Sequence, residues 1–186
     1  LDVYLIHNIS DKDWEGIKQR KVIETFESFK AEGLIKAIGF SYHGTYKGWK
    51  PIFDYYDWDM CQVQQNMIDV DKEVTVQSIA DAGERGCALV IMEPLRGGGL
   101  ANAPASVQAI YDRYPEARRP HEWAFKHLLN YPQISTILSG MTTLEQLKEN
   151  IEHFSRPTSV PNSLSEEEKQ ILREAKAAYE SIVTVP

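Results

Sequence analysis

The sequence predicts an α/β fold built on a parallel sheet. Five short runs rich in β-branched and apolar residues alternate with segments of helical periodicity, which is typical of βαβ units. The run Ala88–Met92 is apolar without alternation, as in a strand buried on both faces. Five units are fewer than the eight of a closed barrel. A doubly wound sheet stays an alternative, although no G-x-G-x-x-G opens a helix.

The expected elements follow one another along the chain. Strands are expected at residues 1–6, 35–41, 60–64, 88–92 and 135–139. Helices are expected at residues 21–33, 46–56, 74–86, 105–114, 121–129 and 142–153, with a last helix capped by Ser163 or Ser165. Residues 10–16, which include Trp14, are expected to form a surface loop. Thr142 and Glu145 have the spacing of a capping box.

Composition excludes several classes of protein. The net charge of −7 argues against a general nucleic-acid binder, and no apolar run approaches the roughly 20 residues of a membrane span. Cys61 and Cys87 lie in or beside expected buried strands, so we expect reduced core thiols in a cytoplasmic protein, with a disulfide or metal site as the less favoured alternative. Because a strand already begins at Leu1, we expect the chain to be a fragment of a longer protein.

Polar, amphipathic or glycine residues follow each expected strand. They are His7 and residues 41–43, 62–66, 92–99 and 140–141. In a parallel barrel such residues meet on the face that carries active sites. The set suits hydrogen bonds to a carboxamide and a phosphate better than hydrolysis, because no nucleophile elbow, Walker A loop or H-E-x-x-H motif is present. Two alternatives remain: a lone histidine can be structural, and the glycines at 97–99 can form a turn without a ligand.

Five segments resemble, in order along the chain, the carboxyl-terminal five-eighths of the aldo-keto reductase family. They are Leu1 to His7 and residues 33–41, 62–66, 92–98 and 139–150. The resemblance implies a (β/α)8 TIM barrel of which only about the last five β/α units are present. Residues 1–154 would hold strands four to eight, and residues 155–186 a linker and C-terminal helix. Ser41-Tyr42-His43-Gly44 and residues 92–98 are similar to the subgroup with a following iron–sulfur ferredoxin-like domain, whose cluster would lie in a part of the parent protein not present here.

The resemblance implies an oxidoreductase that reduces an aldehyde or ketone with NADP or NAD as cofactor. The family uses a tetrad of Asp, Tyr, Lys and His, of which only the histidine is matched, by His7. That residue would orient the carbonyl group and assist proton transfer. The chain alone is therefore expected to be inactive, and the parent protein active on a small carbonyl substrate.

The cofactor positions also follow from the resemblance. Ser41 and Gln62 match residues that hold the carboxamide, Tyr42 stands where asparagine is usual, and Met92 stands where an aromatic ring stacks on the nicotinamide. The remaining positions are Glu93, Pro94, Leu95, Arg96 and Gly97 in the pyrophosphate loop, Gly140, Met141 and Gln146 near the 2′-phosphate of NADP, and Glu149 and Asn150 at the adenine. In that loop the negative Glu93 is expected to bind Arg96 or a backbone amide rather than a phosphate.

Other readings stay open. One is a nicotinamide-binding sensor or regulatory subunit with a reductase-like barrel and little turnover. Another is an unrelated barrel enzyme with a phosphorylated substrate, which predicts a basic residue near Gly140 that the sequence lacks. Because the sequence has no basic residue near Gly140 to bind the 2′-phosphate, we expect only a weak preference for NADPH over NADH. Open barrel edges predict self-association, and neither nucleic acid nor membrane is an expected partner.

Overall fold

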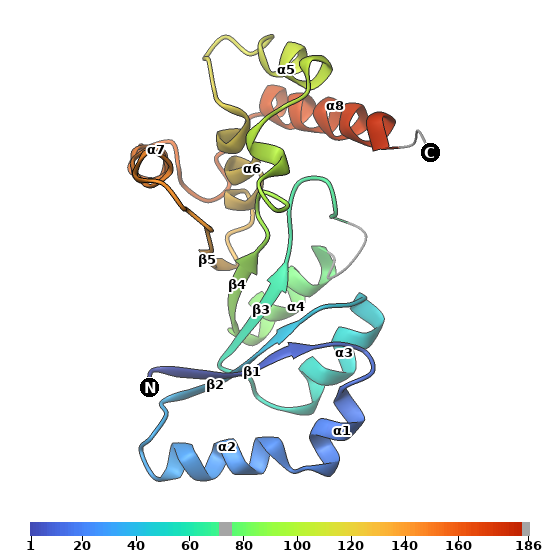
Figure 1. Ribbon diagram of the computed structural model, residues 1–186, viewed down its shortest axis with the longest axis vertical. Coiled ribbons are helices and arrows are strands. Elements are labelled where there is room, and N and C mark those ends of the chain that lie inside the picture. The colour runs from blue at the N-terminus through green and yellow to red at the C-terminus, as the bar shows by residue number, and fades with distance from the viewer. Residues whose placement is uncertain (71–75, 184–186) are drawn as a thin grey trace. The chain divides into compact units, whose positions relative to one another are not determined.

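The computed structural model describes residues 1–70 and 76–183. These fall into two compact units. Unit 1 comprises Leu1–Gln65, Val70–Met92 and Gln133–Thr136, and unit 2 comprises Asn66–Asp69, Glu93–Pro132 and Ile137–Pro186. Figure 1 shows that unit 1 holds the sheet and the helices of the first half of the chain, and unit 2 is helical.

Unit 1 alternates strands and helices as the sequence predicts. The strands are β1 (Val3–Ile9), β2 (Ala37–Tyr42), β3 (Met60–Gln64), β4 (Ala88–Met92) and β5 (Ile134–Ile137), paired in the order β1-β2-β3-β4-β5. β1 to β4 pair in parallel. The helices are α1 (Trp14–Gln19), α2 (Val22–Ala31), α3 (Tyr46–Tyr55) and α4 (Val76–Arg85). The first two residues of the expected helix 74–86 lie outside the described residues. Gly33 and Gly86, the last residues of two expected helices, adopt positive φ just after α2 and α4, as is common where a helix ends.

The sheet has two faces of different character. Phe40, Cys61 and Leu89 are register neighbours across β2, β3 and β4, and none is exposed. With Trp49 and Phe53 of α3, whose rings stack 4.3 Å apart, they belong to the core of unit 1. Side chains alternate along a strand, so the next residue of each strand points to the other face.

Two local predictions are wrong. Trp14 begins helix α1 and is buried against Tyr55, with ring centroids 5.1 Å apart, so residues 10–16 are not simply a surface loop. Ser10 and Asp13 close the preceding turn through their side chains. The capping box of α7 (Leu144–Phe154) begins at Thr143 and not at Thr142.

Unit 2 packs η1 (Gly99–Ala101), α5 (Ala105–Tyr111), α6 (Pro120–Leu129), α7 and α8 (Glu166–Val183). One apolar face of α8 is buried, and its members are Ile171, Leu172, Ala175 and Tyr179. They share a core with Val107, Trp123 and other residues of unit 2. Ser165 caps α8, because its Oγ accepts from the Glu168 amide while Glu168 Oε2 accepts from the Ser165 amide.

The remaining predictions from composition concern cysteines and membranes. Cys61 and Cys87 are free thiols in the structure and both are buried, as expected of core residues. Among the described residues, no helix is long and apolar enough to cross a bilayer.

Candidate functional site

Three of the predicted nicotinamide residues share one face of the sheet in unit 1. Ser41 of β2 is the register partner of Gln62 of β3, and Met92 ends β4 opposite Gln64. Along their strands, Ser41, Gln62 and Met92 alternate with residues whose side chains face the helical core. The structure therefore brings the two predicted carboxamide residues and the predicted stacking residue together on the face away from that core.

Ser41 is held by a bulge in the neighbouring strand. The pairing of β1 with β2 shifts register between Ile6 and Ile9, and Asn8 in the bulge has a φ of 60°. The Asn8 amide donates to Ser41 Oγ over 2.7 Å. That bond uses the hydroxyl as an acceptor and does not use its proton, and the Ser41 side chain is fully buried. His7 lies in the same bulged stretch and is exposed.

The side-chain amide of Gln62 lies beside the thioether of Met92. Its Nε2 lies 3.5 Å from Met92 Sδ, so the amide donates toward the thioether. Because the amide nitrogen of Gln62 points to Met92, the side-chain oxygen is the atom of Gln62 best placed to accept a hydrogen bond from a ligand. A hydroxyl donor, an amide acceptor and a polarizable thioether fit the chemistry of a ring that carries a primary amide.

Tyr42 is engaged inside unit 1. Its ring is fully buried, and its hydroxyl donates to Asp11 Oδ1 and lies 3.1 Å from the Thr45 carbonyl oxygen. Tyr42 neighbours Ser41 in β2, so the two side chains point to opposite faces of the sheet. The hydroxyl of Tyr42 therefore belongs to the packing of α3.

The predicted pyrophosphate loop begins in unit 2 at Glu93. Glu93 Oε2 accepts from the Gly97 amide over 2.5 Å, so this carboxylate binds a backbone amide, as expected. Arg96 pairs instead with Asp69, with 3.1 Å between Nε and Oδ2, and keeps 40% of its side chain exposed. Pro94 is buried and Leu95 half-buried, which anchors the loop.

The loop's amides are only partly free. Those of Arg96 and Gly99 donate to Glu93 and Arg96 carbonyl oxygens within the loop. In the described part of the chain, the amides of Leu95 and Gly98 donate no hydrogen bond. Gly98 has a φ of 88°, and a Cβ added there would meet open space. Two amides and one guanidinium can therefore reach an anion here.

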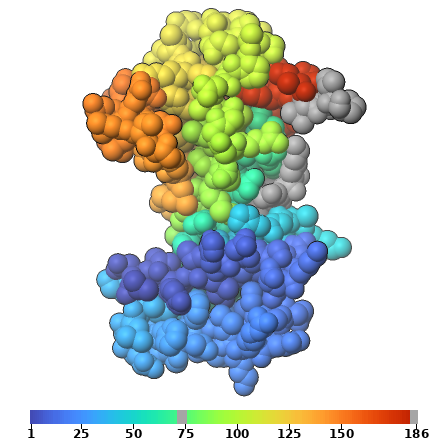
Figure 2. Space-filling view, in the orientation of Figure 1, coloured from blue at the N-terminus to red at the C-terminus, as the bar shows by residue number. Residues whose placement is uncertain are grey.

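The start of α7 is exposed but already capped. Residues 140–148, in the orange segment of Figure 2, are all exposed. Gln146 Oε1 accepts from the amides of Thr142 and Thr143, and the Gln146 amide donates to Thr143 Oγ1. A phosphate at this end of α7 would have to displace part of that box. Gly140 and Met141 contribute exposed surface without a charge.

The predicted adenine pair has partners from other segments of unit 2. Glu149 Oε1 forms an ion pair with Arg119 Nη1, and Glu149 Oε2 lies 3.9 Å from His121 Nε2. Asn150 Nδ2 donates to Ser139 Oγ over 3.0 Å. Burial lowers the pKa of His121, so this histidine is a neutral neighbour of the carboxylate at neutral pH.

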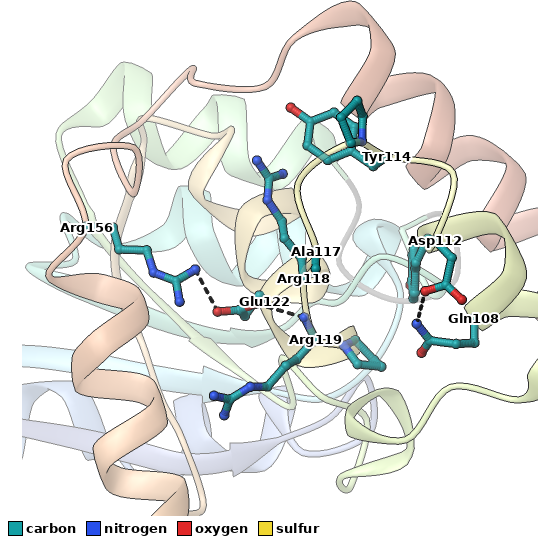
Figure 3. Close-up of a pocket in the computed structure, with 11 residues that line it drawn as sticks. Gln108, Asp112, Tyr114, Ala117, Arg118, Arg119, Glu122 and Arg156 are labelled. Atoms are coloured by element: carbon teal, nitrogen blue, oxygen red, sulfur yellow. Dashed lines mark hydrogen bonds and ion pairs between the residues drawn. The ribbon is translucent and has the colours of Figure 1, made fainter.

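A pocket of about 650 Å³ opens in unit 2 beside Arg119. Figure 3 shows Arg118 and Arg119 extending in different directions from adjacent positions, with Arg156 paired to Glu122. The pocket is lined by Gln108, Tyr111, Asp112, Tyr114, Pro115, Ala117, Arg118, Arg119, Pro120, Glu122 and Arg156.

The arginines of this pocket are already engaged. Burial would raise the pKa of Glu122, but nearby His153, the Arg119 amide and Arg156 lower it to about 2. Arg118 stacks on Tyr114 and pairs with Glu168. None of the pocket residues was predicted from the sequence. The one available signal was the basic pair at 118–119, next to Pro120 at the start of α6, in an acidic chain.

The predicted positions thus fall into two groups. Unit 1 holds His7, Ser41, Tyr42, Gln62 and Met92, and all except Tyr42 lie outside the helical core of the sheet. Unit 2 holds the loop that begins at Glu93 and the residues of α7. Among the described residues, no cluster of three or more His, Cys, Asp or Glu could hold a metal ion.

Comparisons with known proteins agree with this arrangement. The profile of the aldo/keto reductase family matches residues 1–169. A comparison with curated protein sequences finds no match. Among solved structures, an aldo-keto reductase from Bacillus halodurans in its holo form is similar at 21% identity and a TM-score of 0.73, over 94% of this chain and 58% of that one.

Two further structures show the same likeness. An aldo/keto reductase from Klebsiella pneumoniae, in complex with NADP and acetate, is 18% identical with a TM-score of 0.68, over 95% of this chain and 59% of that one. A glycerol dehydrogenase from Gluconobacter oxydans is 15% identical with a TM-score of 0.63, over 96% and 59%. The chain thus spans less than two thirds of their length, and the predicted fold, part of a TIM barrel, is confirmed. Because the family profile matches residues 1–169, the chain belongs to the aldo/keto reductase family.

Proposed function

We propose that the parent protein of this chain reduces an aldehyde or ketone with a nicotinamide cofactor. The observation that carries the proposal is the shared face of Ser41, Gln62 and Met92 in unit 1. That face carries a hydroxyl, an amide and a thioether together, with Gln62 and Met92 half-buried and Ser41 fully buried. This set matches the donors and acceptors of a nicotinamide carboxamide and the flat face of its ring.

Each of these side chains has a separate task in the proposal. Ser41, fixed by the Asn8 amide, donates to the carboxamide oxygen, and Gln62 accepts from the carboxamide nitrogen. Met92 packs on the ring. Tyr42 acts indirectly, because its buried ring fixes the end of β2 next to Ser41. These contacts orient one face of the ring toward the carbonyl substrate.

The adenosine and phosphate end of the cofactor belongs to unit 2. Arg96 and the amides of Leu95 and Gly98 bind the pyrophosphate, and Glu149 and Asn150 bind the adenine. Gly140, Met141 and Gln146 offer no cation to a 2′-phosphate. The chain therefore discriminates weakly between NADPH and NADH.

The chemistry needs residues from more of the barrel. When bound, the cofactor supplies a hydride, and His7 orients the carbonyl oxygen and assists its protonation. The Asp, Tyr and Lys positions of the family tetrad are not matched in these 186 residues. The chain alone therefore binds cofactor without turning over substrate, and the parent protein carries the activity.

The experiment titrates NADPH and NADH into the 186-residue chain and follows the nicotinamide fluorescence. Saturable binding of both, without oxidation when simple aldehydes are added, supports the proposal for this chain. The same assay on the parent protein should show aldehyde-dependent oxidation. Failure of the chain to bind either nucleotide contradicts the proposal. Binding without turnover by the parent protein would favour the sensor or regulatory reading.

A finer proposal concerns the subgroup. The motifs at 41–44 and 92–98 resemble reductases with a ferredoxin-like domain, so we propose that an iron–sulfur cluster belongs to a separate domain of the parent protein. Cys61 and Cys87 are buried in unit 1 and do not provide the four thiolates that such a cluster needs. Iron and sulfide analysis of the parent protein decides this point.

A further inference from the structure

The carboxylate of Glu149 is held from one place, the start of α6. Arg119 is the N-cap residue of α6 and pairs with one oxygen of Glu149. His121, two residues further along, lies 3.9 Å from the other oxygen. Glu149 keeps 27% of its side chain exposed, so an outside ligand can still reach it.

Arg119 is itself fixed before any ligand arrives. Its amide donates to Glu122 Oε2 over 2.8 Å, and Glu122 Oε1 is bound by Arg156 Nη1 over 2.8 Å. Pro120 occupies the first turn of α6, where its fixed φ suits a helix start. The backbone from which the Arg119 side chain extends is therefore well defined.

The second member of the adenine pair is preset in a similar way. Asn150 Nδ2 donates to Ser139 Oγ, which leaves its side-chain oxygen and one amide proton for a ligand. Glu149 thus pairs with Arg119 and lies near His121, Asn150 bonds to Ser139, and both residues keep capacity toward an outside group. A purine that presents an amino group and ring nitrogens matches this capacity.

We propose that Arg119 is a positioning residue for the adenosine half of the cofactor, acting by holding the Glu149 carboxylate in its binding orientation. The inference rests on the proposed function, because that function assigns Glu149 to adenine. A side chain fixed in advance loses less freedom when the ligand binds, so affinity rises without a direct contact to the ligand. Arg119 neutralises Glu149 at the same time and is not available as a free cation for a 2′-phosphate.

The experiment measures the affinity of the 186-residue chain for ADP-ribose, NADH and NADPH by calorimetry, with nicotinamide mononucleotide as a probe of the other half. The variants are Arg119→Gln, Arg119→Lys, Glu149→Gln and the double variant Arg119→Gln/Glu149→Gln. The matched control is Arg113→Gln, which removes a surface ion pair with Glu174 in the same unit. The exposed fractions of that pair, 52% and 35%, are close to the 48% and 27% of Arg119 and Glu149.

We expect Arg119→Gln to lower the affinities for ADP-ribose, NADH and NADPH by the same factor, about tenfold, which corresponds to about 1.4 kcal/mol of binding free energy. Arg119→Lys should recover part of the loss, and the affinity for nicotinamide mononucleotide should not change. In the Glu149→Gln background the further substitution of Arg119 should have little effect, because the two residues act through one contact. Arg113→Gln should bind like the unsubstituted chain.

Three results would overturn the inference. Equal affinities for Arg119→Gln and the unsubstituted chain would show that the ion pair does not position Glu149. A loss confined to NADPH would show a direct contact with the 2′-phosphate, and full additivity in the double variant would show independent roles. If the unsubstituted chain bound no nucleotide, the proposed function itself would fail. That result is distinct from binding that Arg119 does not affect.

Discussion

Gln62 Nε2 lies 3.5 Å from Met92 Sδ on the face of the sheet that also carries Ser41. The two residues are 30 positions apart and meet because β3 and β4 pair in parallel, with Gln62 opposite Val90 and Gln64 opposite Met92. A thioether is a weak acceptor, so a ligand amide that offered a better bond could redirect Gln62 at small cost. The contact keeps the side-chain amide of Gln62 in place without satisfying it fully.

Replacing Gln62 with leucine should weaken nicotinamide binding. The variant keeps an apolar contact with Met92 but removes the side-chain oxygen, so we expect the affinity for nicotinamide mononucleotide to fall about tenfold, as for the loss of one good hydrogen bond. Calorimetric titration measures the change. Gln77→Leu is the control, because Gln77 is an exposed glutamine of unit 1 whose Nε2 donates to Asp81, on the same helix. Equal affinities for the two variants would remove Gln62 from the site.

Glu168, like Glu122, should make the stability of unit 2 sensitive to acid. Burial would raise the pKa of Glu168, but Lys126, the Ser165 amide and Arg118 lower it from its ordinary value of 4.5 to about 2. The stabilisation is therefore complete above about pH 4.5 and disappears as the pH falls toward 2. Glu168→Gln leaves Arg118 and Lys126 without their buried partner, and should cost about 3 kcal/mol of unfolding free energy at pH 7.

Urea unfolding at a series of pH values checks this prediction. The gap in unfolding free energy between Glu168→Gln and the unsubstituted chain should narrow as the pH falls from 4.5 to 2. Glu167→Gln, on the exposed side of the same helix, should follow the unsubstituted chain throughout. A gap independent of pH would mean that the charge of Glu168 does not stabilise unit 2.

His7 should matter little for stability. Its side chain is exposed on β1, so His7→Ala should change the free energy of unfolding by less than about 0.5 kcal/mol. The adjacent Ile6 is buried, and Ile6→Ala should cost about 3 kcal/mol because it opens a cavity. Denaturant unfolding of both variants compares them directly. A large loss for His7→Ala would support the alternative that this histidine is structural.

The exposed edge of the sheet should drive self-association of the isolated chain. β1 and β5 end the strand order, and Val3 on β1 is 43% exposed. A lysine on an edge strand opposes pairing with a second copy, so Val3→Lys should shift the chain toward monomer in light scattering. Val160→Lys, at a 47% exposed position outside any strand, is the control. A monodisperse monomer without substitution would contradict the prediction.

Much of the fold follows from local sequence signals. The apolar run at β4 and the glycines after α2 and α4 locate elements because burial and positive φ leave few other choices. Trp14 was misplaced because its neighbours are polar, and only contact with Tyr55 shows that its ring is buried. Thr142 and Thr143 compete for one cap, and the Gln146 side chain decides between them.

The sequence also could not predict the contacts at the candidate site that join distant parts of the chain. A resemblance of motifs identifies Ser41 and Gln62, but it does not show that they face each other across β2 and β3. Arg119 could not be predicted as the partner of Glu149, because the two residues are 30 positions apart and no local pattern couples them. Of the two partners expected for Glu93, Arg96 or a backbone amide, the structure shows the amide of Gly97, while Arg96 pairs with Asp69, which comes from a distant turn.

Amide hydrogen exchange of the 186-residue chain with and without NADPH tests the central claim most directly, because it locates the bound cofactor on the chain. Binding as proposed slows exchange in the end of β3, in residues 93–99 and in the segment 140–150, while residues 108–120 beside the pocket of unit 2 stay unchanged. Unchanged exchange throughout, or protection confined to residues 108–120, would contradict the proposed binding of a nicotinamide cofactor.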